Sequence, residues 1–155
     1  MSTGSISTVF DTSLFIPELR YGRLEPALGE MVTRAARAGC VSAHRLLRGT
    51  LATRERAGST GIGKGAALPH ARSVHVLEPC IVFARSKRGI EWDAPDGDPV
   101  RLVLLMLSPA ELTAEMHVEW VARGAAVLRL QRQRQRLLDA GTFDAVAAVF
   151  GEALA

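Results

Sequence analysis

The sequence predicts a layered α/β domain, at the border with the α+β class, and three patterns lead to this prediction. Two segments of helical periodicity come first, over about 24–38 and 43–56. Short strand-like segments follow, and one of them, 102–107 (LVLLML), is continuously apolar, as is typical of a central strand covered on both faces. Two further helical segments close the chain. Because the helices come before and after the strands in the chain, we expect helical layers packed on a buried sheet.

The first half of the chain begins with residues 1–20, which we expect to form an irregular or extended lead-in. The helix predicted at 24–38 has apolar residues at helical spacing, a proline in its first turn and Gly39 directly after it, a residue typical of a helix end. The helix predicted at 43–56 carries a leucine stripe, and Ser42 is in position to cap its N-terminus.

The second half alternates between turns and strand-like pieces before it becomes helical. We expect strands at about 66–68, 74–77, 80–85, 90–92 and 100–107. Ser108 and Glu111 form a capping box with Pro109 at the first helical position, which predicts that a helix starts there. Thr142 and Asp144 are typical of the start of a last helix that runs to about residue 154.

Composition places the chain among ordinary globular proteins. Its 155 residues fit one domain, 1–155, with a core over about 5–154, and 48% hydrophobic with 23% charged residues excludes the disordered class. No apolar run approaches the ~20 residues of a membrane-spanning helix, and the N-terminus lacks a signal-peptide pattern. Cys40 and Cys80 have no metal-ligand spacing and are expected to be reduced and buried. We therefore expect a cytoplasmic protein that has no metal and is not inserted in a membrane.

The basic segment 129–136 (RLQRQRQR) has two interpretations. On one helix, Arg129, Arg132 and Arg136 would share a face that resembles a nucleic-acid-binding stripe. However, no DNA-binding motif and no interleaved aromatic residues accompany it, and the formal net charge is only +3. A solvated helix face is the favoured interpretation, so we expect no nucleic-acid partner. A docking surface for an acidic protein stays open as an alternative.

The most informative segment is the glycine-rich run 58–71 (GSTGIGKGAALPHA). It nearly matches a phosphate-binding loop, G-x-x-x-x-G-K-[ST], but Gly65 stands where the hydroxyl residue is needed. Such a loop also follows a strand and opens a helix, whereas this run follows a charged helical segment and Pro69 disfavours a helix after it. Nucleotide binding is therefore the least favoured interpretation, and a turn in which glycines supply positive φ is favoured.

His70 ends this run, and it is the candidate reactive residue. A lone histidine is more often a surface residue or a structural hydrogen-bond partner, which is what we expect of His44 and His75. Pro69 fixes the backbone before His70, and Arg54 lies a short loop away in the sequence. A neutral imidazole is a good nucleophile near pH 7, and a guanidinium neutralises phosphoryl charge, so the combination suits phosphoryl chemistry.

Residues 53–70 (TRERAGSTGIGKGAALPH) resemble the signature of fructose/mannitol-type enzyme IIA domains of the bacterial phosphotransferase system, and the stand-alone nitrogen-regulatory branch most of all. The likeness extends over nearly the whole chain, including 89–92 (GIEW) and the helix that bears His117. The resemblance implies a mixed sheet of about five strands flanked by helices in a single domain. It also implies that His70 accepts a phosphoryl group and that no cofactor is needed.

The same resemblance assigns roles to further residues. Arg54 matches the arginine beside the active histidine, and His117 matches a second histidine that faces the first. Ser59 and Thr60 match a pair that we expect to contribute to phosphoryl binding. Leu68 departs from the family pattern, which more often has isoleucine before the proline, and this change touches none of the polar positions.

The resemblance also implies partners. The donor would be HPr or a paralogous phosphocarrier protein, and the acceptor would be the cysteine of a sugar-specific IIB domain. The alternative is a regulatory protein-binding module, in which phosphorylation of His70 controls contact with a target protein and no onward transfer takes place. The sequence itself does not distinguish transport from regulation.

Overall fold

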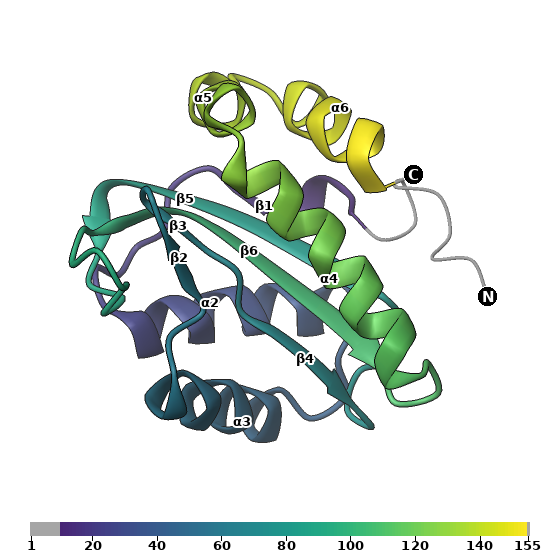
Figure 1. Ribbon diagram of the computed structural model, residues 1–155. Helices are drawn as coiled ribbons and strands as arrows, with labels where there is room; N and C mark the ends of the chain where they lie inside the picture. The colour runs from purple at the N-terminus through teal and green to yellow at the C-terminus, as the bar shows by residue number, and fades with distance from the viewer. Residues whose placement is uncertain (1–9, 155) are drawn as a thin grey trace.

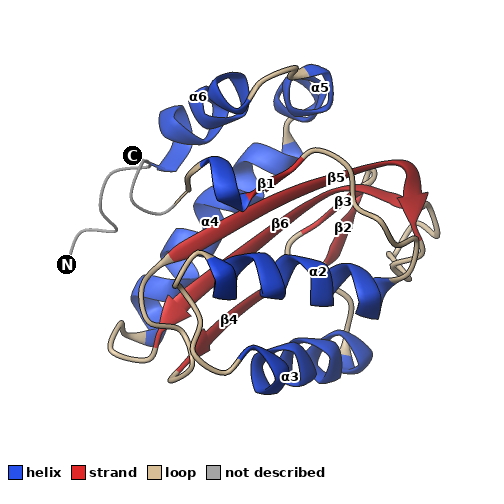
Figure 2. Ribbon diagram, turned by 180° about the vertical axis from the view of Figure 1, so that it is seen from behind, coloured by secondary structure: helices blue, strands red, loops and turns tan. Residues whose placement is uncertain are grey.

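The computed structural model describes residues 10–154. Along this part of the chain the elements are η1 (Thr12–Leu14), β1 (Phe15–Ile16), α2 (Leu24–Arg37), α3 (His44–Ala57), β2 (Gly61–Gly63), β3 (Ala66–Ala67), β4 (His70–Ser73), β5 (Cys80–Ile90), β6 (Val100–Pro109), α4 (Ala114–Arg129), α5 (Gln131–Asp139) and α6 (Phe143–Leu154). Within residues 10–154, five α-helices and a six-stranded mixed sheet confirm the predicted fold class. The sheet lies between two layers, with α2 and α3 on one side and α4 on the other (Figures 1 and 2).

The sheet is built around the long antiparallel pair of β5 and β6. Its strand order is β1-β5-β6-β3-β2, and β4 also pairs with β6. Both β3 and β4 run parallel to β6, with Ala67 opposite Val103 and His70 opposite Met106. The two short strands therefore follow one another along the same edge of β6. Pro69 separates them because it has no backbone N–H to give to a ladder.

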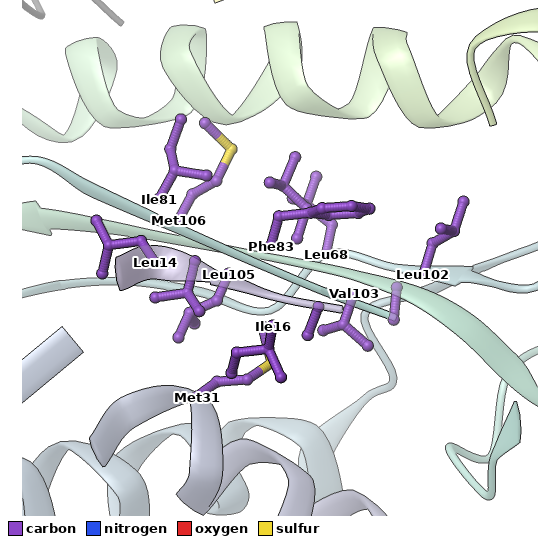
Figure 3. Close-up of a cluster of buried hydrophobic side chains, with 14 of the residues drawn as sticks. Leu14, Ile16, Met31, Leu68, Ile81, Phe83, Leu102, Val103, Leu105 and Met106 are labelled. Carbon is purple, nitrogen blue, oxygen red and sulfur yellow. The ribbon is translucent and has the colours of Figure 1, made fainter. Parts of the chain in front are cut away.

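The core lies on both faces of β6, as the apolar run predicted. Every residue from 102 to 109 is buried. Successive side chains alternate between the faces, so that Leu102 and Met106 lie toward α4 while Val103 and Leu105 lie toward α2 (Figure 3). This alternation decides which residues of β6 and its neighbours can meet α4.

Two sequence predictions about the segment around β4 were wrong. The predicted strand 74–77 is a loop in which Val76 makes only an isolated bridge to Val41, and the strand is β4 instead. The predicted N-cap Ser42 does not cap α3, whose N-cap is Ala43. The Ser42 hydroxyl donates to the backbone oxygen of His75 at 3.3 Å, so this loop uses the group that would have capped the helix.

The predicted helix start at Ser108 was also wrong. β6 continues to Pro109, and α4 begins at Ala114 with Thr113 as its N-cap. The Thr113 hydroxyl accepts the backbone N–H of Met116 at 3.1 Å. A capping preference is worth only about 1 kcal/mol, whereas the strand continues because β4 pairs with both residues, with Arg72 opposite Ser108 and Ser73 opposite Pro109. Ser108 therefore lies fully buried in the sheet.

The basic segment does not form one continuous helix, so Arg129 does not share a helix face with Arg132 and Arg136. α4 ends at Arg129, and Leu130 has extended dihedral angles before α5 begins. Arg134 donates to the backbone oxygens of Leu128 and Arg129, at 2.9 and 2.8 Å, where it satisfies carbonyls at the C-terminus of α4. Arg136 pairs with a glutamate of α6.

The remaining predictions concern the lead-in, the strand 90–92, the two cysteines and the membrane. The lead-in contains η1 and the two-residue strand β1, while residues 1–9 lie outside the described part of the chain. Ile90 of the predicted strand 90–92 is the last residue of β5. Cys40 and Cys80 are both buried free thiols, as expected. Among residues 10–154, each helix is too short or too polar to cross a bilayer.

Candidate functional site

His70 is the first residue of β4, and its backbone position is set by the proline before it. The Pro69 oxygen accepts the backbone N–H of Met106 at 3.1 Å, which aligns β4 with β6. His70 faces Met106 across this parallel pair. Register partners in a sheet share a face, so His70 lies on the side of α4 together with Met106. The imidazole is half-buried and stays accessible from outside.

His117 projects from α4 onto His70, although 47 positions separate the two histidines. His70 Nδ1 and His117 Nε2 are 3.2 Å apart, within hydrogen-bond distance, and the ring centroids are 5.3 Å apart. His117 is only 7% exposed. The structure thus brings together the two histidines that the sequence analysis selected.

Ser108 extends this pair into a chain of three polar groups. It lies two residues beyond Met106 on β6 and therefore on the same face of the sheet. Its hydroxyl is 2.7 Å from His117 Nδ1. Both nitrogens of the His117 ring therefore have a partner, and the ring is held between Ser108 and His70. Ser108 was not among the predicted site residues because its neighbours in the sequence suggested a helix cap.

Both imidazoles are held in the neutral form. Burial lowers the pKa of His70, and the nearby charge of Arg54 lowers it further. Burial is also the main reason why the pKa of His117 falls to about 4, with smaller contributions from His70 and Arg72. Near pH 7 each neutral ring has one N–H donor and one nitrogen lone pair. In the hydrogen bond between the two rings, one histidine therefore donates and the other accepts.

Arg54 lies in the last turn of α3, next to the glycine-rich run. Its Nη1 donates to the backbone oxygen of Gly58 at 2.6 Å, which closes the end of the helix. The side chain is exposed, and its charge acts on His70. The sequence-predicted arginine is thus beside the histidine, and its hydrogen bond in this structure goes to the loop between them.

Ser59 and Thr60 both use their hydroxyls within the turn. The Ser59 hydroxyl accepts the backbone N–H of Gly61 at 3.0 Å. The Thr60 hydroxyl donates to the carboxylate of Glu55, and Glu55 also accepts the Thr60 backbone N–H at 2.9 Å. Glu55 is buried, and the sequence analysis missed it, although its place directly after Arg54 at the same helix end was a usable signal.

The glycine-rich run forms the hairpin of β2 and β3, as the favoured interpretation predicted. Gly63, Lys64 and Gly65 have φ values of 80°, 59° and 78° in succession. Two of these three positions are glycine, which adopts a positive φ at little cost. The run opens no helix, so it lacks the helix N-terminus on which a phosphate-binding loop depends.

Arg72 is a further residue that the sequence analysis did not select. Its Nη1 donates to the backbone oxygens of Ala110 and Leu112, both at 3.1 Å, and so holds the loop between β6 and α4. The other two histidines are an exposed His44 and a half-buried His75, as expected. Within residues 10–154, no group of three or more His, Cys, Asp or Glu side chains is arranged to hold a metal ion.

Comparisons with known proteins agree with this architecture. A fructose-specific EIIABC component of the phosphotransferase system from Bacillus subtilis is 34% identical over 128 residues, which are 83% of this chain and only 20% of that protein. A fructose-specific EIIA component from Haloferax volcanii is 32% identical over 98% of both chains. The crystal structure of the nitrogen regulatory protein IIA-Ntr from Neisseria meningitidis superposes with a TM-score of 0.83 at 28% identity, over 93% of this chain and 97% of that one.

A family model decides the assignment. The model for EIIA 2 of the phosphoenolpyruvate-dependent sugar phosphotransferase system matches residues 8–153, nearly the whole chain. The relatives of known name and the similar structure point to the same family, as the glycine-rich signature did. This chain therefore belongs to the EIIA 2 family of the phosphoenolpyruvate-dependent sugar phosphotransferase system.

Proposed function

We propose that this protein is a phosphocarrier whose His70 accepts a phosphoryl group from the phosphohistidine of an HPr-like protein. The observation that carries the proposal is the contact between two neutral imidazoles, of which His70 is accessible and His117 is buried. Membership of the EIIA 2 family supports a role in phosphoryl transfer. The cysteine of a IIB domain is the proposed acceptor for onward transfer.

The hydrogen-bond chain favours one nitrogen of His70 as the nucleophile. If His117 Nδ1–H donates to the Ser108 hydroxyl, its Nε2 accepts from His70 Nδ1–H, and His70 Nε2 keeps a free lone pair. In the opposite arrangement His117 Nε2–H donates to His70 Nδ1. The lone pair of His70 is then at Nδ1, and its Nε2 carries the hydrogen. Only the first arrangement leaves a nucleophilic nitrogen outside the histidine pair, so we assign the phosphoryl group to Nε2.

The transfer step needs no proton donor. His70 Nε2 attacks the phosphorus in line, a new N–P bond forms, and the N–P bond to the donor imidazole breaks. The positive charge that His70 gains is shared with Nδ1–H, whose hydrogen bond to His117 Nε2 becomes stronger as the charge grows. Arg54 supplies a guanidinium for the phosphoryl oxygens, and positioning with electrostatic stabilisation accounts for the rate.

The surroundings of His70 suit a protein partner. Val74 and Leu77 in the loop after β4, and Val118 directly after His117, are 74%, 60% and 63% exposed. Exposed apolar side chains in segments that directly follow candidate site residues are typical of a surface that another protein covers. The donor and the acceptor in this proposal are both proteins.

The regulatory alternative keeps the same phosphorylated residue but removes the onward transfer. The likeness to a nitrogen regulatory protein supports it. In that case the charge added at His70 would change the binding of a target protein at the same exposed surface. Transport and regulation therefore share the phosphorylation of His70 and differ in the fate of the phosphoryl group.

The test is phosphorylation of the purified chain with phosphoenolpyruvate, enzyme I and HPr, followed by intact mass at mildly alkaline pH. We expect one acid-labile phosphoryl group on the wild type and on His75→Ala, and none on His70→Ala. Incorporation into His70→Ala, or no incorporation into the wild type with HPr and its paralogues as donors, would contradict the proposal. Addition of a IIB domain then separates the alternatives, because only a transport component loses its phosphoryl group to the IIB cysteine.

A further inference from the structure

A cleft lies between α2, α3 and the segment before α2, and His70 is not among its lining residues. Its volume is about 410 Å³, and its lining contains Arg20, Tyr21, Pro26, Gly29, Glu30, Thr33, Arg34, Arg37 and Arg48. None of these residues belongs to the site described above. We call it the arginine cleft.

The arginine cleft has an excess of positive charge that the described residues do not neutralise. Four arginines line it, against Glu30 alone. The Glu30 carboxylate accepts the backbone N–H of Arg20 at 3.0 Å. The salt bridges within residues 10–154 join Arg56 to Glu25 and Arg136 to Glu152, so none involves the cleft. Residues 1–9 contain no aspartate or glutamate that could serve instead. Like charges gathered in a concave site attract anions and focus their field there.

The backbone of α2 makes room for one of these guanidinium groups. Gly29 is a buried residue in the middle of α2, where glycine is disfavoured relative to alanine. A Cβ at this position would lie 2.7 Å from Cζ of Arg48 and 2.9 Å from its Nε and Nη1. Glycine thus allows the Arg48 side chain, which comes from α3, to lie directly against α2.

Another arginine of the cleft, Arg34, is held in place by backbone oxygens of η1 and β1. Arg34 Nη1 donates to the backbone oxygens of Ser13 and Phe15, at 3.1 and 3.5 Å. Thr33 and Tyr21 add hydroxyls to the lining, and Tyr21 is 48% exposed. Guanidinium groups that are held in place lose less conformational freedom when they bind, and their forked donors match phosphate oxygens.

We propose that the arginine cleft binds a small anion that carries two or more phosphoryl groups. The volume lies within the range of small-molecule sites, roughly 300–1,000 Å³. Four arginines and one glutamate give the lining a formal charge of +3 (4 − 1), which a pyrophosphate or tripolyphosphate neutralises more completely than the charge of about −1.5 to −2 on a single phosphate. The proposal does not involve His70 and does not depend on phosphoryl transfer there.

The test is calorimetric titration of the full chain with inorganic pyrophosphate, tripolyphosphate and orthophosphate at about 0.1 M salt, where surface attraction is screened beyond roughly 10 Å. We expect one site per chain, with tripolyphosphate bound most tightly and orthophosphate most weakly. Arg48→Gln should weaken tripolyphosphate binding about tenfold, equal to 1.4 kcal/mol. Arg123→Gln on α4, which removes the same charge from an exposed position, should leave the affinity unchanged.

Two further variants complete the design. Gly29→Ala changes no charge but crowds the Arg48 guanidinium, so it should weaken binding while a thermal melt verifies the fold. His70→Ala should bind normally, which keeps this test separate from that of the phosphocarrier proposal. Equal losses in Arg48→Gln and Arg123→Gln would overturn the proposal, because they would indicate general attraction. So would binding of duplex DNA without binding of tripolyphosphate, because it would indicate an extended polyanion surface.

Discussion

At the scale of single residues, the site depends on how one buried ring is held. His117 has a partner at each nitrogen, Ser108 at 2.7 Å and His70 at 3.2 Å. A serine hydroxyl can donate or accept, so it imposes no tautomer by itself. It provides a partner for His117 Nδ1–H inside the core, where an unpaired donor would be costly. In the proposed phosphocarrier, Ser108 is therefore expected to position His117 and, through it, His70.

Replacement of Ser108 by alanine tests this role. A net hydrogen bond of about 1 kcal/mol predicts that Ser108→Ala transfers the phosphoryl group roughly fivefold more slowly. Ser86→Ala is the matched control, because Ser86 is also a buried strand serine, and its hydroxyl accepts only the backbone N–H of Gly89. The rate from phosphorylated HPr, measured by rapid quench, checks the prediction. Equal rates in the two variants would remove Ser108 from the site.

Arg54 is expected to act in the transition state and not in the fold. Its side chain is exposed, so Arg54→Gln should leave the free energy of unfolding nearly unchanged. The rate of phosphoryl transfer should fall about 100-fold or more, because the equatorial oxygens lose a guanidinium. Arg56→Gln is the control: Arg56 is an exposed arginine two positions away that pairs with Glu25. A similar rate in both variants would contradict the assignment.

At the scale of elements, the end of α3 and the β2–β3 hairpin are tied together by one carboxylate. Glu55 accepts both the backbone N–H and the hydroxyl of Thr60, and the Thr60 backbone oxygen accepts the backbone N–H of Leu68 at 3.1 Å. Leu68 is followed by Pro69 and His70. These contacts connect the helix that carries Arg54 to the strand that carries His70.

Glu55→Gln is therefore predicted to destabilise the protein by about 1–3 kcal/mol, since it weakens charge-assisted hydrogen bonds at a buried site. Urea unfolding measures the change. Glu25→Gln removes an exposed carboxylate whose ion pair with Arg56 should contribute less than about 1 kcal/mol. If the two variants are equally stable, the Glu55–Thr60 contact does not hold the hairpin.

At the scale of the whole molecule, the packing of α4 on the sheet links stability to pH. The folded state keeps His117 neutral down to about pH 4, whereas an unfolded chain protonates this histidine below its ordinary pKa of about 6.5. Between these values the unfolded state binds more protons, so the free energy of unfolding falls as the pH falls. Above pH 6.5 both states are neutral and the histidine contributes no pH dependence.

The predicted loss from His117 reaches up to about 3 kcal/mol as the pH falls from 6.5 to 4. Urea unfolding at several pH values checks it, with His117→Gln as the variant that cannot titrate. The stability of the wild type should fall more steeply than that of the variant over this range, and the two curves should run parallel above pH 6.5. Parallel curves throughout would show that His117 is not kept neutral by the fold.

Local patterns were sufficient for much of the fold. Helical periodicity predicted α2 and α3, and the apolar run predicted the buried strand β6. The glycines of the signature predicted a turn, because φ near +80° is a local property of the backbone. The errors arose where two local signals competed. Ser108 and Pro109 could begin a helix, but pairing with β4 continues the strand through them instead.

The amino-acid pattern was enough to predict the family, the helices α2 and α3, the central strand β6, and His70, Arg54 and His117 as candidate site residues. Those features depend on residues close together in the chain or on a signature that spans it. The tertiary structure alone decided which groups touch. His70 meets His117 because β4 aligns with β6 at Met106, and Ser108 joins them because it lies two residues further along the same face. Gly29 on α2 has no side chain and so leaves room for the Arg48 guanidinium, which comes from α3. Such contacts depend on strand register and helix packing, which no local preference encodes.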